Sequence, residues 1–129
     1  MLLLDTCTLL WLVGNPERLP ERTRELLHVA QKDSLFVSAM SGFEISLKHR
    51  NHQLKLPFPP VEWFALALER HRITSLAVTW EIAMASVALP RIHNDPSDRM
   101  IIATAQLHEL RIITPDPVIH KYPGVKFSW

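Results

Sequence analysis

Short apolar segments alternate with longer helical patterns along the chain, and this alternation restricts the fold more than any other feature of the sequence. The predicted strands are LLL, LFVS, ITSLAV, RIIT and VKFS, at positions 2–4, 35–38, 73–78, 111–114 and 125–128. Because helical segments separate most consecutive strands, tight hairpins are excluded there and parallel pairing through crossovers is expected. The sequence therefore predicts an α/β fold with a mainly parallel sheet covered by helices on both faces.

Six segments have the apolar spacing and the end signals of helices. They cover residues 6–13, 21–31, 43–52, 61–72, 80–89 and 95–110. Thr79, and either Ser38 or Ser41, can cap helices, because a side-chain oxygen there can accept a free main-chain N–H. Asp95 followed by Pro96 has the same form, with proline at the first helical position. Several helices are thus expected to begin directly after a strand.

Length, charge and cysteine content limit the class of protein. At 129 residues the chain has the size of one domain, so we expect residues 1–129 to form a single unit. The formal net charge of +1 indicates neither a nucleic-acid nor a membrane partner, so any basic surface must be local. The single cysteine, Cys7, excludes an internal disulfide, and its apolar neighbours predict that it lies in the core.

The apolar N-terminal segment lacks the features of an export signal. No basic stretch precedes it, and Asp5 interrupts it. The uncharged run over residues 6–16 is also too short to span a bilayer. We therefore expect a cytoplasmic protein without a membrane partner.

Three acidic residues lie where ligands usually bind in parallel sheets, beyond the carboxyl ends of the strands. Asp5 follows the first strand, Asp98 lies in the first turn of the helix over 95–110, and Asp116 follows the strand RIIT. Each also has a simpler explanation. Asp5 can cap a helix, Asp98 can interact with a helix dipole, and Asp116 can form a turn. For Asp116 alone the turn is favoured, and for Asp95 the cap.

Glu44 is different because it lies within a predicted helix. It shares a stripe with Met40, Phe43 and Leu47, so it is predicted to point toward the core, where a charge needs a partner. The simpler explanation is a salt bridge with Lys48, four residues later, which is worth only about 0.3–0.5 kcal/mol. That is too little to explain a carboxylate on an apolar stripe.

Together, these acids would bring three or four carboxylates into one cleft at the edge of the sheet. Like charges there repel one another unless a cation neutralises them. Carboxylate oxygens favour hard divalent ions such as Mg²⁺ or Mn²⁺, and water bound to such ions can become a nucleophile. The pattern therefore indicates metal-assisted hydrolysis of a phosphodiester.

Four motifs, in order along nearly the whole chain, resemble PIN-domain ribonucleases of the VapC toxin type, from prokaryotic toxin–antitoxin pairs. They are LLLDTCTLLWLVGNPERLP, VSAMSGFEISLKHRNHQLKLP, LPRIHNDPSDRMIIATA and IITPDPVIHKYP. The resemblance implies a single PIN domain with a three-layer α/β/α sandwich and a mainly parallel central sheet of four or five strands. Any one motif would be weak evidence for the family, but four motifs in the same order are strong evidence.

The resemblance also implies a site and an activity. The acidic residues that would bind the metal and serve catalysis are Asp5, Glu44, Asp98 and Asp116. The implied cofactor is Mg²⁺, with Mn²⁺ as an alternative, and the implied substrate is single-stranded or looped RNA. Hydroxyls or carboxylates that could support the acids are Thr6, Asp95 and Thr114, unless they are plain turn or cap residues.

Basic residues near the motifs could contact phosphates, although a solvated surface position is the favoured explanation for each of them. They are Lys48, Arg50, Arg91, Arg99 and Lys121. The resemblance further implies a homodimer and a cognate VapB-type antitoxin. A higher toxin–antitoxin assembly is the alternative to the dimer. A C-terminal segment of the antitoxin would lie in a groove of the toxin and block the acidic site, with an Arg or Lys among its residues.

Three other functions fit the sequence less well. A phosphotransferase of the haloacid dehalogenase type also has a strand that ends in Asp, but it needs a second acid two residues later, where this chain has Cys7. A zinc hydrolase would need ligands in zinc spacing, which His49 and His52 lack. A catalytically weak PIN-like module that only binds protein or RNA is the main alternative, and the cost of burying Glu44 argues against it.

Overall fold

The computed structural model describes residues 1–30 and 33–129, and its centre is a sheet of five strands in the order β3-β2-β1-β4-β5. All four neighbouring pairs are parallel. The bounds of the strands are Leu2–Leu4 (β1), Leu35–Ser38 (β2), Ile73–Leu76 (β3), Arg111–Ile113 (β4) and Phe127–Ser128 (β5). The prediction of a mainly parallel sheet of four or five strands is confirmed, and the described pairings are parallel throughout.

Six α-helices accompany the sheet in the described part of the chain. They are Thr6–Gly14 (α1), Glu21–Val29 (α2), Ala39–Arg50 (α3), Pro60–His71 (α4), Trp80–Ala88 (α5) and Pro96–His108 (α6). Two short 3-10 helices, η1 and η2, cover Pro16–Arg18 and Ile119–Lys121. The predicted helices are present with shifted ends, and Gln31, the last residue of the helix predicted over 21–31, lies outside the described residues. No helix within residues 1–30 and 33–129 has the length and apolar character that crossing a bilayer requires.

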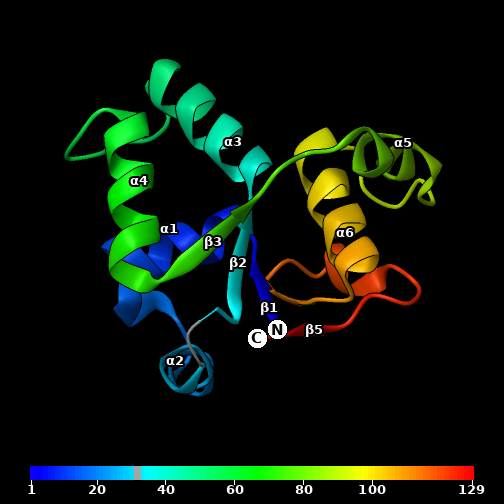
Figure 1. Cartoon of the computed structure of the whole chain (residues 1–129), viewed down its shortest axis with the longest axis horizontal. Helices are drawn as coiled ribbons and strands as arrows, with labels where there is room; N and C mark the ends of the chain where they lie inside the picture. Colours follow the sequence, from blue (N-terminus) through cyan, green and yellow to red (C-terminus); the bar gives the residue numbers. More distant parts are fainter. Residues whose placement is uncertain (31–32) are drawn as a thin grey trace.

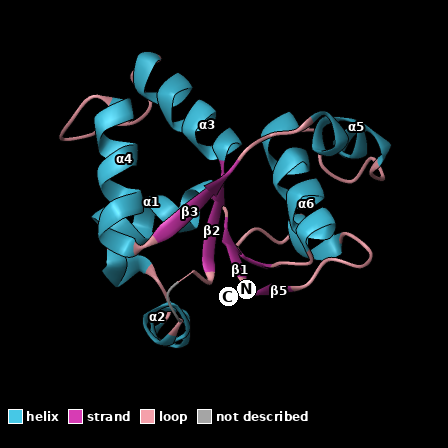
Figure 2. Ribbon diagram, viewed as in Figure 1, coloured by secondary structure: helices cyan, strands magenta, loops and turns pink. Residues whose placement is uncertain are grey.

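Successive residues of β1 pack on opposite faces of the sheet, and this produces the three layers (Figures 1 and 2). Leu4 is fully buried in one core, where it packs with residues of α1, α2, α3 and α4 such as Leu9, Ile45 and Trp63. Leu3 is fully buried in the other core, with Ile101 and its neighbours on α6. The predicted PIN-like α/β/α sandwich is therefore confirmed.

Polar side chains at strand ends fix where the helices begin. The hydroxyl of Ser38 accepts the N–H of Met40 (3.0 Å) at the start of α3, so Ser38, not Ser41, is the cap. Thr79 caps α5 through the N–H of Ile82 (3.2 Å). Ser38 lets α3 start immediately after β2, and Asp5 caps α1 directly after β1, so the first turns of both helices lie at the carboxyl edge of the sheet.

Cys7 is not in the core, contrary to the prediction. In the first turns of α1 the face toward the sheet is taken by Thr6, Thr8 and Leu9, which leaves Cys7 at the flank and only partly buried. This partial burial raises the pKa of its thiol to about 11, and the negative charge of Asp5 adds to the effect.

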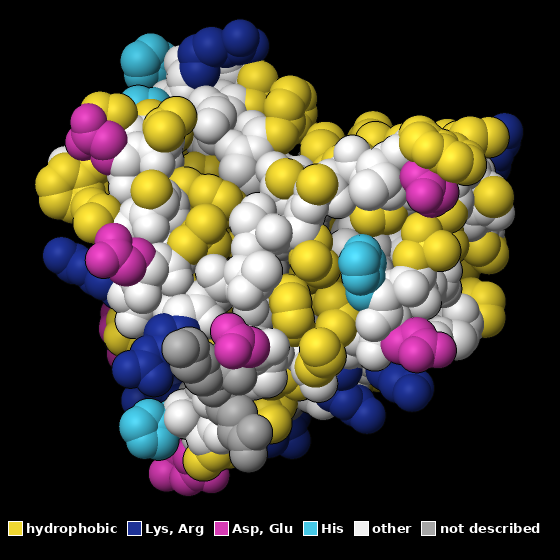
Figure 3. All heavy atoms as spheres, in the orientation of Figure 1, with side chains coloured by type: hydrophobic (Ala, Val, Ile, Leu, Met, Phe, Trp, Pro, Cys, Tyr) yellow, Lys and Arg dark blue, Asp and Glu magenta, His cyan; other side chains and the backbone are white. Residues whose placement is uncertain are grey.

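One helix carries an exposed apolar stripe. Trp80, Met84 and Val87 lie on the outer side of α5, and their exposed fractions are 71%, 66% and 80%. Figure 3 shows apolar side chains gathered at the upper right, where α5 lies in Figure 1. Exposed apolar side chains that gather in a patch indicate a surface for association rather than packing within this chain.

Candidate active site

Asp5 is a buried carboxylate at the carboxyl end of β1, held by fixed donors. It caps α1, because its Oδ1 accepts the N–H of Thr8 at 2.8 Å. Its Oδ2 accepts the hydroxyl of Thr114 at 2.5 Å. Burial raises the pKa of Asp5, and the hydrogen bonds from Thr114 and Thr8 act in the opposite direction. The fold thus orients this carboxylate firmly while opposing its charge.

Thr114 connects Asp5 to Asp116. It is fully buried after β4, and its Oγ1 donates to Asp5 while accepting the N–H of Asp116 at 3.1 Å. The Oδ1 of Asp116 accepts the N–H of Val118 at 2.9 Å, which is the turn contact that was favoured for this residue alone. Its Oδ2 is thereby directed elsewhere, toward His93.

His93 joins Asp116 to Asp98. Its Nε2 lies 2.8 Å from Oδ2 of Asp98 and 3.3 Å from Oδ2 of Asp116. His93 was not among the site residues predicted from the sequence. Its place in the acidic motif, two residues before the capping Asp95, could have drawn attention to it. Only the path of the loop, however, brings its ring between the two acids.

Asp98 lies in the first turn of α6, among other negative charges. Burial raises the pKa of its carboxyl to about 7, and the charges of Asp95, Glu44 and Asp116 act in the same direction, whereas His93 opposes them. The mutual repulsion shows that these acids are near one another. A cation is the natural partner for such a group.

Glu44 faces the same region, although not for the predicted reason. The buried positions of α3 are Ser41 and Ile45, whereas Phe43 is 57% exposed, so the predicted stripe does not face the core. The Oε1 of Glu44 lies 3.0 Å from Oγ1 of Thr6, the residue after Asp5. Its Oε2 forms a salt bridge with Lys48 at 2.9 Å, and this contact raises the pKa of the lysine.

Arg99 does not have the geometry expected of a phosphate contact. Its guanidinium donates to the hydroxyl of Tyr122 and to main-chain carbonyls in the last turn of α5 and in the loop that leads to α6. The carbonyls belong to Ser86, Val87, Leu89, Pro90 and His93. These contacts engage both Nη1 and Nη2, so the side of the guanidinium that would grip a phosphate is already turned to main-chain carbonyls. Arg99 instead holds the loop that carries His93.

The structure also shows which contacts are made by the residues that were predicted to support the acids. Asp95 caps α6, since its Oδ1 accepts the N–H of Ser97 at 2.9 Å. Thr6 contacts Glu44, and Thr114 contacts Asp5. Both threonine hydroxyls therefore bond a carboxylate, whereas Asp95 acts at the start of the helix.

The donor chemistry of this region fits a divalent cation. Among the described residues, one group could supply three ligand atoms that all lie within 4.8 Å of one another, and it consists of His93, Asp98 and Asp116. Asp5 is one hydroxyl away from Asp116 through Thr114. The structure thus gathers the four acids at one edge, but the tightest group contains His93 and omits Asp5 and Glu44. Carboxylate oxygens in this number favour Mg²⁺ or Mn²⁺.

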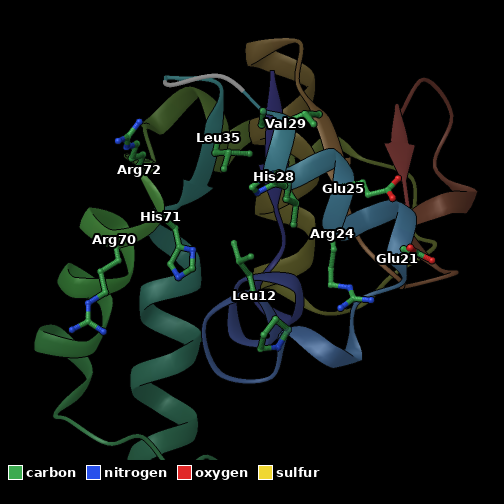
Figure 4. Close-up of a pocket in the computed structure, with 13 residues that line it drawn as sticks. Leu12, Glu21, Arg24, Glu25, His28, Val29, Leu35, Arg70, His71 and Arg72 are labelled. Atoms are coloured by element: carbon green, nitrogen blue, oxygen red, sulfur yellow. The ribbon is translucent and has the colours of Figure 1, made fainter.

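A cavity lies elsewhere in the molecule (Figure 4). It has a volume of about 800 Å³ and is lined by residues of α1, α2 and the end of α4, including Leu12, Arg24, His28 and His71. Burial lowers the pKa of His71. None of the four acids is among its described lining residues, so it is separate from the acidic site.

Comparison with known proteins gives matches over almost the full length of the chain. A model of the PIN domain family matches residues 2–125. Ribonuclease VapC22 of Mycobacterium tuberculosis is 32% identical over 130 residues, which cover 98% of this chain and 97% of that protein.

Solved structures with the same fold include two toxin–antitoxin assemblies. A chain of a toxin–antitoxin complex from Klebsiella pneumoniae is 26% identical with a TM-score of 0.66, and the match covers 97% of this chain and 95% of that one. A chain of DNA-bound VapBC from Salmonella typhimurium is 20% identical with a TM-score of 0.71, covering 98% and 96%. The second likeness concerns the fold alone. Each match spans the segments that carry the four acids.

Proposed function

The chain belongs to the PIN-domain family, among the VapC-type ribonucleases, and from this membership we propose that it is a metal-dependent endoribonuclease acting as a toxin. The observation that carries the proposal is the convergence of Asp5, Glu44, Asp98 and Asp116 at one edge of a parallel sheet. The raised pKa values of Asp5 and Asp98 support it, because burial opposes the negative charge of both carboxyls and a bound cation would offset that cost. Residues 1–129 would act as one PIN domain.

We propose Mg²⁺ as the cofactor, with Mn²⁺ able to replace it. Asp98 and Asp116 would hold it, and Asp5 and Glu44 would complete the acidic set. When bound, a divalent ion stabilises negative charge on the phosphate and on the leaving 3′ oxygen, and lowers the pKa of a water molecule.

The chain's own residues would prepare this site for the substrate. Thr114 keeps Asp5 and Asp116 oriented through one hydroxyl, and Thr6 does the same for Glu44. Asp116, at the open side of this pair, would hold the attacking water. Lys48 remains the proposed phosphate contact, because its side chain is 45% exposed and lies beside the acids.

We propose that the substrate is single-stranded or looped RNA. The name of the Mycobacterium tuberculosis relative supports ribonuclease activity. The position of the acids at the carboxyl ends of the strands supports a flexible substrate, since a phosphate of an unpaired strand can approach them there.

We also propose a VapB-type antitoxin as partner and a homodimer as the assembled state. The toxin–antitoxin complex from Klebsiella pneumoniae supports an antitoxin. The net negative charge of the acidic site suits an antitoxin segment with an Arg or Lys that would neutralise it. The exposed stripe of Trp80, Met84 and Val87 on α5 supports an association surface for a second copy.

The test is cleavage of a labelled single-stranded RNA by the purified chain, with Mg²⁺, with Mn²⁺ and with excess EDTA. We expect cleavage with either ion and none with EDTA. Asp98→Ala should abolish cleavage, whereas Glu62→Gln, which removes an exposed carboxylate on α4, should leave it unchanged. Cleavage by Asp98→Ala at the normal rate, or in EDTA, would refute the assignment. Tight RNA or protein binding without any turnover would instead favour a binding module.

A further inference from the structure

His93 lies between two of the acids, and its hydrogen-bonding partners define which nitrogen carries the hydrogen. Its Nδ1 accepts the main-chain N–H of Asp95 at 3.2 Å. A nitrogen that accepts a hydrogen bond has no hydrogen, so in the neutral ring the hydrogen is on Nε2. Nε2 faces Oδ2 of Asp98 at 2.8 Å and Oδ2 of Asp116 at 3.3 Å.

This assignment argues against direct metal ligation by His93. A ligand nitrogen must present a lone pair to the ion, so ligation through Nε2 would move the hydrogen to Nδ1. There it would face the N–H of Asp95, and two donors would oppose each other. The ring is therefore arranged as a donor to the carboxylates, although the three side chains together have the spacing of a metal site.

We propose that His93 is a positioning residue that uses its Nε2–H to hold Asp98 and Asp116 in the arrangement that binds the ion. This inference rests on the proposed metal-dependent function. Carboxylates that ligate metals are themselves hydrogen-bonded, because a carboxylate oxygen can accept a hydrogen bond on one lone pair and bind a cation with another. One donor between two like charges also reduces their repulsion.

The main chain around His93 is fixed independently of the ring, so the ring is presented from a defined position. The N–H of His93 donates to the hydroxyl of Tyr122 at 2.8 Å, and its carbonyl accepts from Arg99 at 3.1 Å. Arg99 belongs to α6, the helix that carries Asp98. The donor and one of its acceptors thus share a single rigid unit.

Two amide variants distinguish the roles of the two ring nitrogens of His93. The amide of Gln at position 93 can place an N–H near the position of Nε2, whereas the shorter Asn can supply only an acceptor near the position of Nδ1. A purely structural role through Asp95 would be rescued by His93→Asn. A positioning role through the acids would be rescued by His93→Gln.

The measurement is Mn²⁺ binding to the full chain, followed by the electron paramagnetic resonance signal of free Mn²⁺. We expect His93→Asn to weaken binding at least about tenfold and His93→Gln to stay within about threefold of the original chain. His108→Asn, on the exposed end of α6, is the matched control and should bind normally. Thermal melting establishes that each variant is folded.

A second measurement needs no variant. Pulsed electron paramagnetic resonance on the Mn²⁺-loaded original chain should show no directly coordinated nitrogen. A strong ¹⁴N coupling would overturn the inference, because His93 would then be a ligand. Normal Mn²⁺ binding by His93→Asn, or equal losses in both variants, would also overturn it.

The outcomes distinguish this inference from the proposed function. If the original chain binds Mn²⁺ and cleaves RNA but the variants contradict the expected order, only the role of His93 fails. If the original chain neither binds Mn²⁺ nor cleaves RNA, both fail.

Discussion

The two sides of the acidic site hold their carboxylates in different ways. Asp5 accepts hydrogen bonds from a main-chain N–H and from the buried hydroxyl of Thr114, so the fold itself determines its orientation. Asp98 has His93 as its hydrogen-bonding partner among the described residues, and three neighbouring acids oppose its charge. One carboxylate is built into the sheet edge, whereas the other has one side-chain partner and lies among like charges.

The different surroundings of the two acids indicate which of them a bound metal ion would affect more. Burial is the largest influence on the pKa of both acids, but the opposing hydrogen bonds are more numerous at Asp5. At Asp98 the remaining influence comes mostly from like charges, which a divalent ion would reverse. The side with Asp98 is therefore where metal binding, pH and stability should be linked most strongly.

The largest effect should be the pH dependence of metal affinity. Because the pKa of Asp98 is raised to about 7, the ion must displace a proton below that pH. We expect Mn²⁺ affinity to fall about tenfold per pH unit between pH 7 and 5, since one proton is exchanged. Titrations in this range measure the slope. An Mn²⁺ affinity that does not change with pH would mean that Asp98 behaves as an ordinary exposed carboxylate. Asp98→Asn should lose the pH dependence together with most of the Mn²⁺ affinity.

The next largest effect tests the side that is built into the fold. Thr114→Val removes the hydroxyl shared by Asp5 and Asp116, and we expect the rate of RNA cleavage to fall about tenfold. Thr114→Ser is the matched control, because it keeps the hydroxyl and should keep most of the rate. Equal rates in the two variants would mean that the hydroxyl does not orient the acids.

A smaller effect concerns stability without metal. The folded-state pKa of Asp98, about 7, lies above its ordinary value of 3.8, so ionisation increasingly destabilises the fold as the pH rises between these values. Asp98→Asn should therefore raise the Tm of the metal-free chain at pH 8 by roughly 3–6 °C, the shift that about 1 kcal/mol produces in a domain of this size.

The same comparison at pH 4 should show almost no difference in Tm, because Asp98 is largely protonated there when folded. Asp5→Asn serves as the contrast between the two sides. It should not raise the Tm at pH 8, since an amide cannot accept both of the hydrogen bonds that Asp5 accepts. A higher Tm for Asp5→Asn would contradict the view that hydrogen bonds hold Asp5 while like charges oppose Asp98.

The smallest effect is expected at Lys48. Its salt bridge to Glu44 is partly exposed, so Lys48→Met should change the free energy of unfolding by less than about 0.5 kcal/mol. If Lys48 contacts phosphate, KM for RNA should rise about threefold and depend less on salt. An unchanged KM with an unchanged salt dependence would leave Lys48 as a surface residue only.

The parts of the molecule that follow from local chemistry could be predicted from the sequence. Strand ends, helix caps and the acids beside them are set by neighbouring residues, so Asp5, Ser38, Thr79 and Asp95 have their predicted local roles. The order of the motifs was also enough to identify the family.

The parts that depend on contacts between distant segments could not be predicted. The ring of His93 reaches Asp116 only because the segment after α5 takes a particular path. Arg99 was expected at the surface, yet it is used to fix that path, since nothing in a linear sequence shows which carbonyls lack a partner. The exposure of Phe43 likewise depends on which neighbour covers α3, so helical spacing alone misplaced the face of Glu44.

The central position of β1 in the sheet has a consequence during protein synthesis. β1 pairs with β4, and Asp5 receives its hydroxyl contact from Thr114, 109 residues later in the chain. A nascent chain that has not yet exposed β4 outside the ribosome therefore has no assembled cluster of acids, whatever its first half has folded into. We therefore expect the acidic site to assemble only once β4 is free to pair, so a chain that stops before residue 114 should show no RNA cleavage.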